Sequence, residues 1–313
     1  MAVDPKIKRL AIQALAVALL FAAAGTLLFN TLANLEARRI ASGFAFLWRE
    51  AGFEIGETAL LSYGAADTYA KALAVGLANT FKVALLGIVF ATLLGTAIGL
   101  FRLSSNALLK SVGGTYVEFI RNVPLLVQLF FWYALVTEGL PAPREALSPL
   151  PGVFLSNRGL FFPTLSGVPE LQGFNFAGGG VLSPEFAALL IGLSIYTASF
   201  IAEIVRAGVL AVPRGQWEAA RAVGLSERDV LRHVVAPQAL RVVVPPLTSQ
   251  YLNLTKNSSL AVAIGYPDLV SIANTTINQT GQAIEGIAII MAVYLTISLA
   301  ISALMNWYNA RLR

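Results

Sequence analysis

Long apolar runs alternate with short polar intervals along most of this chain. A helix needs about 20 apolar residues to cross the hydrocarbon core of a bilayer. Six segments reach that length, and each is predicted to form a membrane-spanning helix: Leu10–Leu35, Ala70–Phe101, Tyr116–Val136, Phe186–Val209, Leu240–Val270 and Gly286–Trp307. The pattern therefore predicts an all-α integral membrane protein with about six transmembrane helices.

Several of these segments carry residues that disturb a simple span. A cleaved signal peptide competes for the first run, but that run exceeds the roughly 7 to 15 apolar residues of a signal sequence, so we expect a retained helix. Lys82 is expected to snorkel to the interface, with a functional charge in a transport pathway as the alternative. Pro124 predicts a kink near the start of the third span, either an interfacial bend or a gate element facing a pore. Glu203 and Arg206 are three residues apart and can pair on one helix face.

The fifth run is apolar but repeatedly interrupted. It is broken by Pro245 and Pro246, by Lys256 and Asn257, and by Gly265 and Pro267. Interrupted helices at membrane depth line cavities and not lipid. The polar stretch 271–285 is expected to separate this span from the last one.

Two polar intervals are predicted to lie outside the membrane on one side. Residues 36–69 hold no apolar piece long enough to cross, and residues 138–183 are rich in Pro and Gly without helical or strand periodicity. We expect a loop or a small cap over 138–183.

Composition and charge agree with a membrane protein. Hydrophobic residues make up 57% of the 313 residues and charged residues 12%, against about 25% charged in soluble domains. Thirteen basic residues fall on the side that carries both termini and residues 211–241, and six on the other, so this side is predicted to be cytoplasmic. The basic residues are scattered, which argues against a nucleic-acid partner.

Composition also excludes several kinds of chemistry. The chain has no cysteine and one histidine, His233, so no metal site and no catalytic residue is expected. It contains no phosphate-binding loop of the Gly-x-x-x-x-Gly-Lys-Ser/Thr type, so no nucleotide cofactor is expected on this chain.

Residues 211–241 form the long polar interval of the C-terminal half. Good helix formers over Gln216–Val223 are followed by Gly224 in a position suited to a left-handed residue. Ser226 and Asp229 then have the spacing that caps a second helix. The pattern predicts a short, smooth helix, a tight turn and another helix at the membrane surface, a shape suited to docking a partner.

At these residues the chain resembles the membrane subunits of bacterial binding-protein-dependent ABC importers. The family signature is Glu-Ala-Ala, a Gly four positions after it, and a later Ile-x-Leu-Pro; here it reads Glu218-Ala219-Ala220, Gly224, Val234 and Ala236-Pro237, with Val for Ile and Ala for Leu. Further segments are similar to the polar amino acid permease branch, close to the general L-amino acid permeases: 116–128, 202–208, 212–216, 237–241 and 254–260.

The resemblance implies a type I ABC importer permease fold with a cytoplasmic coupling helix. It implies an N-terminal helix and periplasmic segment over 1–69, a transmembrane domain over 70–308 with a periplasmic loop at 138–183 and a coupling loop at 211–241, and a cytoplasmic tail at 309–313. The residues expected to meet the ATPase are Gln216, Glu218, Ala219, Ala220, Arg221 and Gly224. The candidates for the transport pathway are Asn253, Lys256, Asn257, Glu118 and Arg121.

The resemblance also implies the partners. They are ATPase subunits that hold ATP and magnesium, a second and related permease subunit, a periplasmic amino acid binding protein and the lipid bilayer of the bacterial inner membrane. Two other functions stay open: a secondary amino acid transporter, which would carry ion-coupling carboxylates and an inverted repeat, and a membrane receptor or scaffold that docks a cytoplasmic protein.

Overall fold

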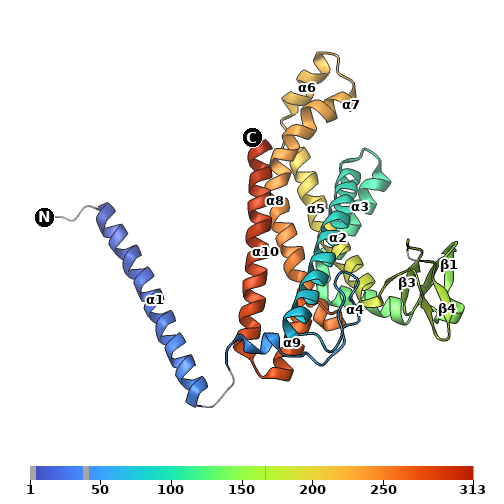
Figure 1. Ribbon diagram of the computed structural model, residues 1–313. Coiled ribbons are helices and arrows are strands. Elements are labelled where there is room, and N and C mark those ends of the chain that lie inside the picture. The colour runs from blue at the N-terminus through green and yellow to red at the C-terminus, as the bar shows by residue number, and fades with distance from the viewer. Residues whose placement is uncertain (1–4, 38–41, 166, 313) are drawn as a thin grey trace.

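The computed structural model describes residues 5–37, 42–165 and 167–312. The larger helices are α1 (Pro5–Ala37), α2 (Tyr69–Leu103), α3 (Ala107–Asn122), α4 (Leu125–Thr137), α5 (Pro184–Leu210), α6 (Arg214–Ala222), α8 (Ala236–Asn257), α9 (Leu269–Thr280) and α10 (Ala283–Leu312). Short helical turns are η1 (Phe44–Trp48), η2 (Pro143–Glu145), α7 (Glu227–Asp229), the π-helical η3 (Val230–Val235) and η4 (Ser258–Ile264). Helices α2, α3, α5, α8 and α10 run side by side, with α6 and α7 at one end and α9 at the other (Figure 1).

The predicted spans are present as helices. Among the described residues, α1, α2, α5 and α10 are each long and apolar enough to cross a membrane, and two bent pairs could supply one span each. The side chains of α1 that the structure describes are all exposed. Helix α10 continues to Leu312, so the predicted tail at 309–313 is part of this helix as far as it is described.

The kink predicted at Pro124 is confirmed: it divides the third predicted span into two helices, α3 and α4, which meet at 105°. Val123 is extended (φ −98°, ψ 126°), the conformation that the ring of a following proline favours. The break frees carbonyl groups at the end of α3. Gln128 satisfies two of them, since its Nε2 donates to the carbonyls of Ile120 (2.9 Å) and Val123 (3.0 Å). The bend is therefore held by a built-in hydrogen-bonding partner.

The centre of the bundle is the contact between α2 and α5. Small residues let the two backbones approach, as is usual between helices in membranes. A Cβ added at Gly95 would lie 2.7 Å from the Cβ of Ile201, and one added at Gly99 would lie 2.8 Å from the carbonyl oxygen of Ala202. These two glycines set the distance between α2 and α5.

The fifth span is interrupted at Gly265 and Pro267, as predicted, and not at Pro245 and Pro246. Pro245 and Pro246 are inside α8, which continues past them to Asn257. The break follows η4 at Gly265, which has φ +79°, and α9 leaves at 51°. Asp268 caps α9 by accepting a hydrogen bond from the amide of Ser271 (2.8 Å). The stretch predicted as a polar separator is therefore largely the helix α9.

Residues 147–182 form a small β cap next to α4 (Figure 1). Its strands are β1 (Leu147–Leu150), β2 (Val153–Ser156), β3 (Gly159–Phe162), β4 (Glu170–Gln172), β5 (Asn175–Ala177) and β6 (Gly180–Leu182). They make an antiparallel sheet of order β1-β2-β3-β6 and a separate β4-β5 pair. Phe176 stacks on Phe154 (4.5 Å between centroids) and lies 4.9 Å from Phe161, so a cap with its own aromatic core occurs where a loop or cap was predicted.

The segment 42–68 packs on the end of the bundle opposite α6. Asn79 of α2 anchors it by donating to the carbonyl of Glu57 (2.9 Å), and the same amide group donates to the carbonyl of Pro267 before α9 (3.0 Å). The prediction that Lys82 snorkels is wrong, because its Nζ lies 3.2 Å from a carboxylate oxygen of Glu57 and 4.1 Å from the ring centre of Phe186. Lys82 is thus an internal tie between α2 and this segment.

Candidate functional site

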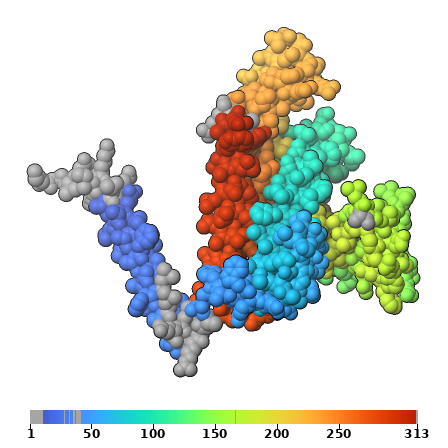
Figure 2. Space-filling model, viewed as in Figure 1, coloured from blue at the N-terminus to red at the C-terminus, as the bar shows by residue number. Residues whose placement is uncertain are grey.

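The predicted docking loop forms the far end of the molecule. Helix α6 projects beyond the ends of α5 and α8, and α7 and η3 return the chain from it to α8 (Figures 1 and 2). The chain from Glu227 through η3 and α8 to Ile264 is one continuous helical unit. A displacement of α6 would therefore act directly on a helix that enters the membrane.

The turn between α6 and α7 has the conformation that the sequence predicts. Gly224 has φ +84°, in the left-handed region that glycine adopts without strain. The amides of Gly224 and Leu225 donate to the carbonyls of Arg221 (2.9 Å) and Ala220 (3.3 Å), which closes the end of α6. Ser226 then caps α7, since its Oγ accepts from the amide of Asp229 (3.3 Å). The predicted capping pair is confirmed.

The loop has a core of its own, and Ala220 belongs to it. Ala220 is only 5% exposed and packs with Val212, Val230, Val235 and Ala239, while Trp217 covers the cluster. The predicted contact of Ala220 with a partner is therefore replaced by an internal one. Its small side chain lets α6 lie close to η3.

Arg221 is also committed within the loop. Its Nε and Nη2 donate to the two carboxylate oxygens of Glu227, at 2.7 and 3.1 Å. These hydrogen bonds hold the pKa of Glu227 below its usual range and raise the pKa of Arg221. A lowered carboxylate pKa stabilises the folded loop above the ordinary pKa of Glu, and this contribution is lost as the pH falls through the lowered value. Arg221 clamps α6 to α7.

The remaining predicted docking residues form an outward-facing surface. Gln216, Glu218, Ala219 and Gly224 are exposed, and Glu218 makes no ion pair with any residue that the structure describes. Val223, which was not predicted as a docking residue, is 77% exposed beside them. A carboxylate, small side chains and one exposed apolar side chain make a surface that a complementary partner can cover. We call Gln216, Glu218, Ala219, Val223 and Gly224 the docking surface.

The predicted pathway residues fall into two groups. Asn253 and Lys256 are exposed and Asn257 is half-buried near the end of α8, whereas Glu118 and Arg121 lie on α3. A lysine exposed at the membrane-embedded end of a helix is costly against lipid. Lys256 is therefore expected to face water or protein beyond this chain.

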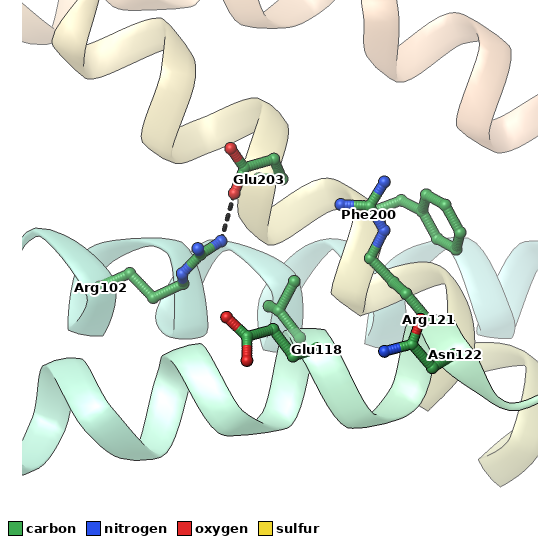
Figure 3. Close-up of a pocket in the computed structure, with 7 residues that line it drawn as sticks. Arg102, Glu118, Arg121, Asn122, Phe200 and Glu203 are labelled. Atoms are coloured by element: carbon green, nitrogen blue, oxygen red, sulfur yellow. Dashed lines mark hydrogen bonds and ion pairs between the residues drawn. The ribbon is translucent and has the colours of Figure 1, made fainter.

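The second group lines a charged pocket of about 510 Å³ between α2, α3 and α5. Its lining includes Arg102, Glu118, Arg121, Asn122, Phe200 and Glu203 (Figure 3). Glu203 accepts hydrogen bonds from Arg206 and, across the pocket wall, from Arg102. The pairing of Glu203 with Arg206 is confirmed; Arg102 was missed because it is 101 residues away in the sequence.

The chain is similar to known transport proteins over nearly all of its length. The family model described as "binding-protein-dependent transport system inner membrane component" matches residues 87–313. YhdX of Escherichia coli K12, named as an amino-acid ABC transporter permease, is 47% identical over 99% of this chain and 95% of its own length. The general L-amino acid transport system permease AapQ of Rhizobium johnstonii is 42% identical over 99% of this chain and 93% of its own length.

Solved structures have the same fold. A subunit of an amino acid ABC transporter crystallised with histidines has a TM-score of 0.59 at 29% identity, covering 78% of this chain and 95% of that one. A chain of the inward-facing MetNI methionine transporter has a TM-score of 0.57 at 18% identity, covering 77% of this chain and 96% of that one.

Proposed function

The chain belongs to the family of binding-protein-dependent transport system inner membrane components, and from this premise we propose that it is the permease subunit of an ATP-driven importer of polar L-amino acids. The observation that carries the proposal is the docking surface on α6, displayed at one end of a bundle of membrane-spanning helices. Relatives that match nearly the full chain are named for amino acid transport. Their names support the class of substrate.

The structure suggests how ATP hydrolysis on a partner would move this subunit. An ATPase subunit carrying ATP and magnesium would bind the docking surface, with Glu218 as its charged contact. The internal core at Ala220 and the Arg221–Glu227 clamp would transmit the movement to η3 and α8. The 22 residues of α8 reach about 33 Å at 1.5 Å per residue, far enough to carry it to Lys256.

The same arrangement supports the proposed partners. Lys256 and Asn257 at the end of α8 would lie in a pathway shared with a second, related permease subunit, where a cation and an amide could stabilise the carboxylate of a passing amino acid. A periplasmic binding protein would deliver the amino acid from the side of the β cap. ATP hydrolysis itself would take place on the ATPase subunits and not on this chain.

We propose a topology with both termini and α6 in the cytoplasm and the β cap and residues 42–68 in the periplasm. Because the chain has no cysteine, single cysteines report it cleanly. Gln172 is exposed on β4, so Gln172→Cys should react with an impermeant maleimide in intact cells. Labelling only after the inner face is opened would contradict this topology.

The proposed function is tested by reconstituted uptake. The chain, its partner permease, the ATPase and the binding protein are placed in proteoliposomes with radiolabelled L-glutamine outside and ATP in the lumen. The proposal predicts uptake that needs both ATP and the binding protein. Uptake driven by a proton or sodium gradient without ATP would identify a secondary transporter, and an absence of uptake of every amino acid tested would favour a receptor or scaffold.

A further inference from the structure

The charged pocket between α2, α3 and α5 has the size of a small-ligand site. Its volume of about 510 Å³ lies within the 300 to 1,000 Å³ usual for such sites. Glu118, Arg121 and Asn122 enter it from α3, and Phe200 and Glu203 enter it from α5 (Figure 3). The pocket thus combines both signs of charge with an amide and an aromatic ring.

The charges of this pocket divide into committed and free ones. Glu203 is neutralised by Arg102 and Arg206, which also ties α2 to α5. Glu118 and Arg121 form no ion pair with any residue in the described part of the chain. Arg121 instead rests over the ring of Phe200, 4.7 Å from its centre, which holds the guanidinium in place. One carboxylate and one oriented guanidinium are left for a ligand.

We propose that this pocket binds the zwitterionic head group of an amino acid. Arg121, with the amide of Asn122, would donate hydrogen bonds to the α-carboxylate, because a guanidinium matches a carboxylate in geometry and charge. Glu118 would accept hydrogen bonds from the α-ammonium group. The inference rests on the proposed function only in taking an amino acid as the cargo.

The position of the pocket indicates its place on the transport route. Arg102 is in the last turn of α2, and Glu203 is seven residues before the end of α5 at Leu210, so the pocket lies in the half of the bundle that carries α6. Lys256 is at the opposite end of α8 from the docking loop. In the proposed topology, the pocket is a binding site on the cytoplasmic side, which an imported amino acid would reach after it passes Lys256.

The pocket would recognise the head group of the amino acid and not its side chain. Glu118 and Arg121 are themselves exposed, so the pocket opens to the surface on the side where a ligand's side chain would project. Of the residues that the structure describes, none encloses that side of the pocket and selects a particular side chain there. This agrees with the general L-amino acid transport for which one full-length relative is named.

Three probes test the proposal in the assembled complex without the binding protein. L-Glutamine carries both charged groups, N-acetyl-L-glutamine lacks the ammonium group and L-glutaminamide lacks the carboxylate. Binding is measured by equilibrium dialysis of labelled probe against the complex in nanodiscs. Losing one charge-assisted contact should weaken binding by about tenfold or more, so wild type should bind glutamine at least that much tighter than either analogue.

The variants assign each group. Arg121→Gln should weaken glutamine and N-acetylglutamine by about tenfold and leave glutaminamide unchanged, because only the first two carry the carboxylate. Glu118→Gln should weaken glutamine and glutaminamide and leave N-acetylglutamine unchanged. Lys110→Gln, an exposed change of charge on α3 away from the pocket, is the matched control and should leave all three unchanged.

A structural role for these charges gives a different result. If the charges only stabilise the fold, the variants should assemble less well, but the relative affinities for the three probes should stay as in wild type. That outcome overturns the proposal. If Arg121→Gln does not assemble, Glu118→Gln and Asn122→Ala carry the test alone. The wild-type complex could import glutamine with ATP while the pocket variants distinguish the three probes as wild type does. That result would refute the proposed binding site but leave the proposed function standing. Wild type that imports no amino acid refutes the function itself.

Discussion

The left-handed turn at Gly224 should be required for docking the ATPase. Gly224 has φ +84°, and a Cβ added there would meet nothing within 4 Å. A substitution at this position therefore costs backbone conformational energy and no packing energy. For an L-residue the left-handed conformation costs about 1 to 2 kcal/mol, more for a β-branched residue and less for Asn. A cost of that size shifts the population of the correctly turned loop by about 5- to 30-fold.

The series Gly224→Asn, Gly224→Ala and Gly224→Val tests this account. Co-purification of the ATPase and ATP-driven uptake should fall in that order, with Asn near wild type and Val close to inactive, while membrane insertion stays normal. Gly215→Ala is the matched control, because Gly215 lies in α6, also has open space around it and has no positive φ. Alanine favours a helix over glycine, so this control should retain activity. Normal uptake by Gly224→Val would refute the reasoning.

Three further predictions follow from the same structure. Glu218→Lys should abolish ATPase co-purification and uptake with normal insertion, because it reverses the charge of the docking surface; normal ATPase binding would refute that role. Lys256→Met should give an assembled complex with slow or altered uptake if Lys256 lines the pathway, and poor assembly if it pairs across the subunit interface; unaltered assembly and uptake would refute both. Gly95→Ala should lower the free energy of unfolding of the purified subunit by about 1 to 3 kcal/mol, because the added Cβ would lie 2.7 Å from the Cβ of Ile201. Gly114→Ala, with open space around it, should leave that free energy unchanged.

The features predicted correctly from the sequence depend on local chemistry. The apolar runs form helices because a helix satisfies its own backbone hydrogen bonds in lipid. The docking loop was predictable because the turn at Gly224 and the cap made by Ser226 depend only on residues a few positions away in the sequence. These signals need no knowledge of the rest of the fold.

The features that the sequence did not reveal depend on distant partners. Lys82 is half-buried because it pairs with Glu57, 25 residues away, and Arg102 reaches Glu203 across 101 residues. The sequence motif suggests that Ala220 is an exposed contact, but in the fold η3 covers it. The strands of the cap have only three or four residues each, too few to establish a period.

The neighbouring residues Ala219 and Ala220 allow the most direct test of the docking surface. Ala219 is exposed on α6, whereas Ala220 is 5% exposed and faces the loop core. Each is replaced by a single cysteine, labelled with a photoreactive maleimide and irradiated in the assembled complex. The account predicts that Ala219→Cys is labelled and crosslinks to the ATPase subunit, and that Ala220→Cys is labelled poorly and forms no such adduct. Equal crosslinking from both positions, or none from Ala219→Cys in a complex that transports, would contradict it.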